Sequence, residues 1–354
     1  MALRCGIVGL PNVGKSTIFN ALTAAGAAAE NYPFCTIEPN IGIVPLADPR
    51  LDRLVQIFRP KKVTPTSVEF VDIAGLVQGA SKGEGLGNQF LGHIRSVDAI
   101  AQVVRCFEDP DVVHVHGSID PQRDREVIQT ELALADLETL MKAIQKVEKK
   151  AKAGDKLSSQ QLEAYHKVEK ILNDGKPARS LQLAPEEKPL LNELFLLTSK
   201  PMLYVLNVSE KELNQRVPIE DAEVIALSGK IESEISELPL EERKAFLQEV
   251  GLKDSGLNQL AHAAYKLLNL ITFFTAGEKE VRAWTIPKGT KAPQAAGVIH
   301  SDFEKGFIAA ECYAFNDLDT FGSEPKVREA GKIRVEGKDY TVRDGDIFFF
   351  RFNV

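Results

Sequence analysis

Short and mostly apolar runs recur along the first two thirds of the chain, bounded by glycine, proline or polar residues. Runs of this length with few polar positions are typical of buried strands in a parallel sheet. Between some of them, apolar residues at spacings of three and four predict helices, the first over residues 16–22. The predicted strands cover residues 3–8, 67–72, 98–105, 201–207 and 223–227. The pattern therefore predicts an α/β domain with a mostly parallel sheet.

A helical pattern interrupts this domain between about residues 120 and 170. Ile128, Leu132 and Leu140 lie on one helical stripe, and a second stripe follows the polar break around Gly154. Two adjacent helices of this kind predict an antiparallel helical hairpin or coiled coil inserted into the sheet domain. Residues 142–170 contain eight lysines and four acidic residues. A solvated helix face and a contact with RNA or a ribosome both explain this surplus.

After about residue 275 the pattern changes again, to short strands separated by turns. Residues 281–285, 331–340 and 346–350 are the clearest of these strands. We expect a small α+β module with a binding role, because no group of catalytic residues occurs in it. The three patterns predict a nucleotide-binding domain at 1–118 and 200–276, a helical insertion at 119–199 and a C-terminal domain at 277–354.

The loop after the first predicted strand, residues 9–17, has the sequence Gly-Leu-Pro-Asn-Val-Gly-Lys-Ser-Thr. It matches the phosphate-binding pattern G-x-x-x-x-G-K-[ST] in full. The backbone N–H groups of such a loop surround phosphate oxygens, the lysine reaches the β- and γ-phosphates, and the serine hydroxyl ligates Mg²⁺. We therefore predict a nucleotide site, with a P-loop that contributes Asn12, Val13, Gly14, Lys15, Ser16 and Thr17.

Two further segments fit the switch regions of a P-loop protein. Thr36 lies in a loop with two prolines, where it either meets Mg²⁺ and the γ-phosphate or is an ordinary surface threonine; Phe34 is a further candidate nucleotide contact. Asp72 ends a predicted strand and can hold Mg²⁺, and Gly75 allows a backbone N–H to approach the γ-phosphate. Leu76 follows, where Ras-like proteins have the glutamine that orients water. Hydrolysis therefore needs another group, or is slow.

Base recognition and catalysis are expected in later loops. Guanine-specific proteins carry Asn-Lys-x-Asp after a strand, but here residues 207–210 read Asn-Val-Ser-Glu. The two replacements predict that preference for guanine is relaxed or reversed. His114 in a polar loop either positions water or is an ordinary loop histidine. The expected contacts with the base are Asn207, Val208, Glu210, Ser228 and Gly229.

Composition and charge limit the partners and the cellular compartment that we expect for this protein. The 354 residues carry a net charge of −7, so contact with nucleic acid requires a local basic patch. No apolar stretch approaches the roughly 20 residues that span a bilayer, so we expect no membrane contact. The four scattered cysteines form no zinc or redox pattern. Since the first strand starts at residue 3, we expect no signal peptide and a cytoplasmic protein, which we take to be a monomer.

The motifs at residues 9–17, 72–76 and 207–210, the helical insertion and the segment 283–307 together resemble the YchF family of Obg-related P-loop proteins, also called Obg-like ATPases. The resemblance runs the whole length of the chain and implies a C-terminal TGS domain of β-grasp type. It also implies preference for ATP over GTP, Mg²⁺-dependent hydrolysis without the usual glutamine, and association with ribosomes through the helical hairpin and the TGS domain. His114, Lys15 and Gly75 would then be the catalytic residues.

Three functions remain to be compared. The leading one is a switch that hydrolyses ATP slowly, and the second is a conventional GTPase that serves translation or ribosome assembly. The third is a non-enzymatic module in which nucleotide is a structural ligand, a hypothesis that Leu76 supports. Asn12 adds the hypothesis that K⁺ binds beside the phosphates and supplies positive charge during hydrolysis.

Overall fold

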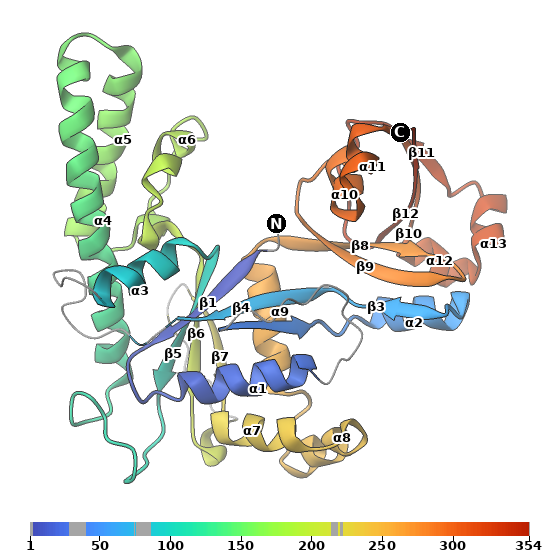
Figure 1. The fold of residues 1–354 in the computed structure, drawn as a ribbon, viewed down its shortest axis with the longest axis horizontal. Helices are drawn as coiled ribbons and strands as arrows, with labels where there is room; N and C mark the ends of the chain where they lie inside the picture. The colour runs from blue at the N-terminus through green and yellow to red at the C-terminus, as the bar shows by residue number, and fades with distance from the viewer. Residues whose placement is uncertain are drawn as a thin grey trace. The chain divides into compact units, whose positions relative to one another are not determined.

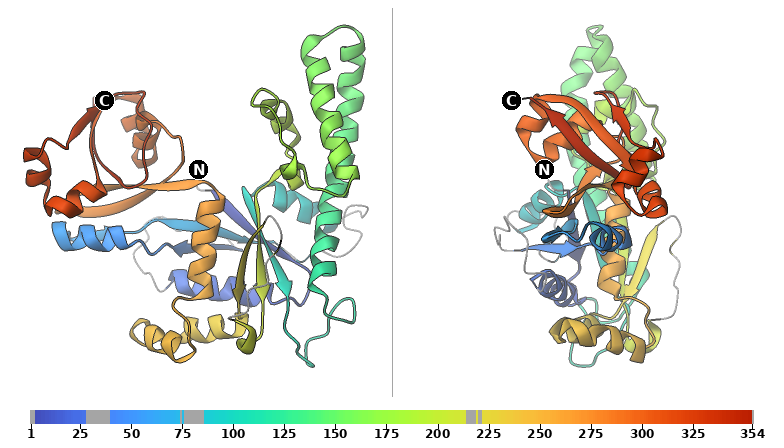
Figure 2. Two further views of the ribbon diagram at one scale, coloured as in Figure 1. Left: turned by 180° about the vertical axis from the view of Figure 1, so that it is seen from behind. Right: turned by 90° about the vertical axis from the view of Figure 1, so that its right-hand side faces the viewer.

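The computed structural model describes residues 3–27, 40–73, 75, 86–213, 219 and 222–353. Phe34, Thr36 and Leu76, which the sequence assigns to the switch segments, lie outside these residues. The described chain contains two sheets of six strands each (Figures 1 and 2). It divides into two compact units, one comprising Met1–Ala25, Glu38–Gly42 and Glu69–Ala264, the other Gly26–Ile37, Ile43–Val68 and Tyr265–Val354.

The first sheet has the strand order β2-β4-β1-β5-β6-β7, and its pairs from β4 to β7 are parallel. The α/β prediction is confirmed, and all five predicted strands are present with ends that differ by at most one residue. The bounds are Arg4–Gly9 for β1, Ile41–Pro45 for β2, Ser67–Asp72 for β4, Ala99–Arg105 for β5, Met202–Asn207 for β6 and Glu223–Leu227 for β7.

The centre of this sheet explains where a ligand can bind. Every residue of β5 and of β6 is buried, as expected for central strands covered on both faces. The carboxyl ends of these parallel strands lie at one edge of the sheet, where α/β proteins bind their ligands. Arg105 and Asn207 are the last residues of the two strands. The chain thus places both side chains at the ligand-binding edge.

Helices follow most strands of the first sheet, and a buried carboxylate fixes two of them. Glu232 accepts a hydrogen bond of 2.6 Å from the backbone N–H of Gly256, at the start of the last helix in this group. Burial raises the pKa of Glu232 to about 7. The helices are α1 (Lys15–Ala27), α3 (Leu86–Arg95), α7 (Gly229–Glu237), α8 (Leu240–Glu249) and α9 (Gly256–Leu267).

The predicted helical hairpin is formed by α4 (Pro121–Lys152) and α5 (Lys156–Asn173), which run antiparallel and extend away from the first sheet (Figures 1 and 2). Asp120 and Asp155 cap the two helices by accepting backbone N–H bonds. Midway along α4, the buried Asp136 accepts the backbone N–H groups of Leu197 and Thr198 at 2.7 and 2.8 Å. The chain returns through η1 (Ala178–Ser180), α6 (Lys188–Leu191), η2 (Asn192–Leu194) and η3 (Leu197–Ser199).

The second sheet corresponds to the predicted C-terminal β-grasp module and has the order β11-β10-β12-β8-β9-β3. Its core joins Phe273 and other aromatic side chains to three buried alanines of one helix. The strands are β3 (Lys62–Thr64), β8 (Leu270–Ala276), β9 (Glu280–Pro287), β10 (Phe307–Ala314), β11 (Arg334–Glu336) and β12 (Asp346–Phe352). The helices are α2 (Pro49–Phe58), α10 (Ala292–Ile299), α11 (Ser301–Lys305), α12 (Phe315–Phe321) and α13 (Glu324–Glu329).

The segment 43–68 groups with the C-terminal unit, whereas the boundaries predicted from the sequence include it in the nucleotide-binding domain. Leu51 and Leu54 of α2 join the core that contains Phe274. Arg50 also forms an ion pair with Asp344, with an N···O distance of 2.6 Å. These contacts join residues far apart in the sequence, so no local pattern indicates them. Within the described chain, every helix is too short or too polar to cross a membrane.

Candidate functional site: a nucleotide cleft at the edge of the first sheet

The P-loop connects β1 to α1 and has an unusual backbone. Asn12 and Gly14 have φ values of 61° and 87°, in the left-handed region that favours glycine and, to a lesser degree, asparagine. The backbone N–H of Ile18 donates to the carbonyl oxygen of Gly14 at 3.0 Å and closes the first helical turn. The amino end of α1 therefore faces the loop with free N–H groups, which favours a bound phosphate.

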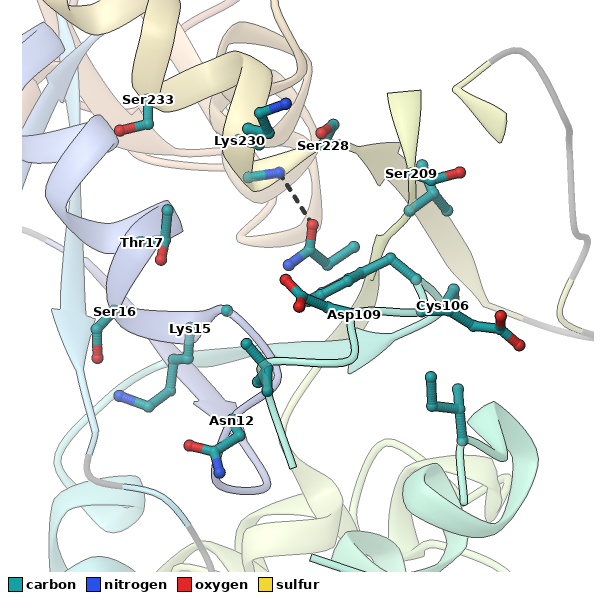
Figure 3. Close-up of a pocket in the computed structure, with 18 of the residues that line it drawn as sticks. Asn12, Lys15, Ser16, Thr17, Cys106, Asp109, Ser209, Ser228, Lys230 and Ser233 are labelled. Atoms are coloured by element: carbon teal, nitrogen blue, oxygen red, sulfur yellow. Dashed lines mark hydrogen bonds between the residues drawn. The ribbon is translucent and has the colours of Figure 1, made fainter. Parts of the chain in front are cut away.

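Asn207 at the end of β6 joins the P-loop to the base-binding end of the site. Its Nδ2 donates to the carbonyl oxygen of Val13 at 3.0 Å, and its Oδ1 accepts the backbone N–H of Gly229 at 2.9 Å. Figure 3 marks the second bond with a dashed line. A Cβ atom on Gly14 would lie 2.1 Å from Nδ2 of Asn207, so any side chain there would displace this bridge. The asparagine therefore fixes the distance between the two ends of the site.

Lys15 and Asp72 form an ion pair across the phosphate-binding end. The Lys15 residue is 9% exposed, so its ammonium group is largely shielded from water and depends on this partner. Ser16 follows Lys15 in the first turn of α1, and Gly75 lies where a Cβ atom would be 3.5 Å from the carbonyl oxygen of Gly9. The hydroxyl of Ser16 and the carboxylate of Asp72 are hard oxygen donors of the kind that Mg²⁺ prefers. This donor set fits Mg²⁺.

These residues line one cleft with a volume of about 1570 Å³. Figure 3 shows Asn12, Lys15 and Ser16 at one end, and Ser209, Ser228 and Lys230 at the other. A cleft of this size and lining accommodates a nucleoside triphosphate. Of the site residues predicted from the sequence, those that line it are Asn12, Gly14, Lys15, Ser16, Thr17, Asp72, Gly75, Asn207, Val208, Glu210, Ser228 and Gly229.

Two predicted contacts lie elsewhere in the described chain. Val13 is 1% exposed and contributes its carbonyl oxygen to Asn207 from beneath the loop. His114 is also buried and is absent from the lining of the cleft. Its Nε2 lies 2.7 Å from Oδ2 of Asp124, and its Nδ1 accepts the backbone N–H of His116 at 3.2 Å. The tautomer with its proton on Nε2 satisfies both contacts, because it donates to Asp124 and accepts at Nδ1.

One wall of the cleft was missed by sequence reasoning. The segment after β5 lines it with Cys106, Phe107, Glu108, Asp109 and Val112, and Lys230 and Ser233 of α7 line another part. The available signal was the position of this segment, because loops that follow the carboxyl ends of parallel strands border the ligand site. Burial raises the pKa of the Cys106 thiol to about 11, which disfavours the reactive thiolate.

The end of the cleft that the sequence predicts to bind the base differs from the guanine signature. Val208 is buried, and its backbone N–H donates to the carbonyl oxygen of Leu227 at 2.9 Å. The 3₁₀ turn η4 (Glu210–Glu212) follows, and Ser209 caps it by bonding to Glu212. The carboxylate of Glu210 accepts a hydrogen bond of 2.9 Å from Nζ of Lys230 and raises the pKa of that lysine. The acidic group that would receive guanine N–H donors therefore already has a cationic partner.

Known proteins resemble the chain along its whole length. Residues 4–148 match the family model of a "50S ribosome-binding GTPase", and residues 270–353 match YchF-GTPase_C, described as a "protein of unknown function (DUF933)". The "Ribosome-binding ATPase YchF" of Bacillus subtilis is 56% identical, with 100% of both chains covered. The protein of the same name from Escherichia coli O157:H7 is 54% identical, again over 100% of both.

A solved structure agrees with these sequences. It is described as the "YchF GTPase" of Schizosaccharomyces pombe, and it is 39% identical to this chain, with a TM-score of 0.89. The match covers 99% of this chain and 97% of that one. Both the sequence and the arrangement of the described elements are thus shared with one group of proteins. The chain belongs to the YchF family.

Proposed function

We propose that this protein is an ATPase that binds ATP in the cleft, hydrolyses it slowly and acts as a molecular switch on ribosomes. The observation that carries the proposal is the union of a complete P-loop with a base-binding end in which Lys230 holds Glu210. The relatives named as ribosome-binding ATPases support the same function. GTP binds less well in this account, because valine and a longer glutamate at 208 and 210 replace the lysine and aspartate of the guanine signature.

Hydrolysis requires that Lys15 change its partner. Its ammonium group leaves Asp72 for the β- and γ-phosphates, while the P-loop N–H groups and the amino end of α1 hold the remaining oxygens. Asp72 and Ser16 would then hold Mg²⁺, which neutralises the charge that develops on the phosphates. The backbone N–H of Gly75 and the Thr36 hydroxyl are further proposed contacts at this end. A water oxygen bonds to the γ-phosphorus as the bond to the bridging oxygen breaks, which yields ADP and phosphate.

We propose His114 as the group that orients the attacking water. In the described conformation both ring nitrogens are occupied, by Asp124 and by the backbone N–H of His116. The histidine must therefore break both contacts and move to the cleft before it acts. The free energy needed to break these buried contacts slows turnover. This agrees with a switch that hydrolyses ATP slowly.

Replacement of His114 tests its role. We expect His114→Ala to lower kcat for ATP by about 10- to 100-fold, while the Kd for ATP stays within about twofold, since the ring is absent from the binding cleft. His114→Gln can still donate to Asp124 and separates loss of the ring from loss of folding. The control is His262→Ala on the exposed face of α9, measured in the same steady-state assay. Wild-type kcat in both His114 variants would refute the role.

Asn12 supports a proposed K⁺ site beside the phosphates. Its Nδ2 donates to the carbonyl oxygen of Val113 at 3.0 Å, which leaves Oδ1 to accept a cation. A monovalent cation there would add positive charge where negative charge develops during hydrolysis.

The potassium proposal predicts a difference between salts of equal ionic strength. We expect wild-type kcat to be at least about threefold higher in KCl than in NaCl, because the smaller ion fits the asparagine and phosphate oxygens less well. The Asn12→Ala variant should have equal rates in both salts, and His262→Ala should keep the wild-type ratio. Equal wild-type rates, or a ratio that survives in Asn12→Ala, would contradict the proposal.

We assign ribosome binding to the helical hairpin and to the C-terminal module, which the sequence predicts to be a TGS domain. Three hairpin lysines have acidic partners, namely Lys142, Lys152 and Lys167. Among the described residues no ion pair involves the exposed lysines near the tip, which are Lys146, Lys149, Lys150 and Lys156. Unpaired lysines at the end of a projecting hairpin suit contact with RNA phosphates.

Charge reversal at the hairpin tip tests this assignment. We expect Lys149→Glu/Lys150→Glu to weaken co-sedimentation with ribosomes and to reduce its dependence on salt, because fewer counterions are released on binding. Basal ATPase activity should not change. The matched control, Lys244→Glu/Lys253→Glu, carries the same charge change at exposed positions outside the hairpin. Equal binding by both variants would exclude the tip and leave the C-terminal module as the contact.

A second candidate function is a GTPase, which the description of the Schizosaccharomyces pombe relative favours. It requires that Glu210 leave Lys230 and accept the N–H donors of guanine. We place the protein in the cytoplasm with the ribosomes it is proposed to bind. The expected monomer stays a prediction that light scattering can check.

A further inference from the structure

Arg105, the last residue of β5, is a buried cation without an acidic partner among the described residues. The residue is 1% exposed. Buried arginines usually pair with carboxylates, because an unpaired charge in the interior is costly. Here the guanidinium group donates only to backbone carbonyl oxygens. Such an arrangement constrains the backbone, because the planar guanidinium group has donors in fixed directions and each carbonyl oxygen must lie along one of them.

The four carbonyls come from two segments of the chain. Three belong to the loop after β5, namely those of Phe107 at 3.1 Å, Asp109 at 3.3 Å and Val112 at 2.9 Å. The fourth belongs to Asn12 of the P-loop, at 3.5 Å. The guanidinium group also lies 4.6 Å from the ring centroid of Phe107. Arg105 thus connects the loop to the phosphate-binding backbone.

A second contact joins the same two segments. The side chain of Asn12 donates to the carbonyl oxygen of Val113, the residue after the last one that Arg105 holds and the residue before His114. The loop itself lines the cleft through Phe107, Asp109 and Val112, and Figure 3 shows Asp109 beside the site. A shift of this loop would therefore move both the wall of the cleft and His114.

We propose that Arg105 is a positioning residue for hydrolysis, which holds the segment 107–112 against the P-loop. Arg105 does not line the cleft and acts through the loop, whose last held residue is two positions before His114. The step from loop position to turnover rests on the proposed function, whereas the anchoring of the loop does not. Without the arginine the loop loses three hydrogen bonds and the P-loop loses one, so the segment that leads to His114 is no longer anchored.

Two substitutions separate geometry from charge and packing. Arg105→Met fills a similar volume and donates nothing, and Arg105→Lys keeps the charge but places its donors on one nitrogen that cannot span both segments. Arg179→Met is the matched control. Arg179 is largely buried, donates to the carbonyl oxygen of Thr198 at 3.4 Å, and lies outside the lining of the cleft.

The experiment is hydrogen exchange of the full-length protein by mass spectrometry, together with steady-state ATPase kinetics. We expect amides of residues 107–116 to exchange about tenfold faster in Arg105→Met than in wild type, and kcat to fall about tenfold with a smaller change in KM. Arg105→Lys should fall between, and Arg179→Met should match wild type in both measurements. In the Arg105→Met background, His114→Ala should lower kcat far less than it does in wild type.

Three results would overturn the proposal. The first is unchanged exchange at residues 107–116 in both Arg105 variants. The second is faster exchange with wild-type kcat, and the third is a loss of kcat that adds in full to that of His114→Ala. If His114→Ala alone keeps wild-type kcat, the role of the histidine fails, whereas faster exchange and lower kcat in Arg105→Met still support the arginine. If Arg105→Met does not fold, Arg105→Lys decides between these outcomes.

Discussion

The bridge made by the buried Asn207 side chain fixes the frame of the site. It bonds to Val13 under the P-loop and to Gly229 at the start of α7, so one amide joins three parts of the chain. Its Nδ2 occupies the space that a side chain at position 14 would need. This is a second reason for glycine at that position, in addition to the left-handed backbone. Because buried amide groups must keep their partners, the phosphate-binding and base-binding ends are held in a constant relation.

Two polar contacts around this frame are of the opposite kind, because in our account they break during turnover. Lys15 is paired with Asp72, and His114 with Asp124. In our account, phosphate takes Lys15 from Asp72, and the histidine leaves its carboxylate before it acts. A constant backbone frame with exchangeable polar contacts suits a switch, since these contacts change partners while the frame stays intact.

Local sequence patterns predicted much of this frame and little of what surrounds it. The P-loop and the central strands are contiguous and have strong periodicity, so 12 of the predicted site residues line the cleft. The roles of Arg105 and of the wall at 106–112 depend on contacts with the P-loop nearly a hundred positions earlier, which no local pattern records. For the same reason α2 was not assigned to the C-terminal unit. The burial of His114 depends on Asp124 at the start of the inserted hairpin.

The most direct test of this account is a calorimetric titration of the full-length protein with ATP and with GTP, in the presence of Mg²⁺. Our account predicts that ATP binds at least about tenfold more tightly, a difference of about 1.4 kcal/mol. That result would mean that the valine and glutamate at 208 and 210 have ended the preference for guanine. Tighter binding of GTP would contradict the account and make the protein a conventional GTPase.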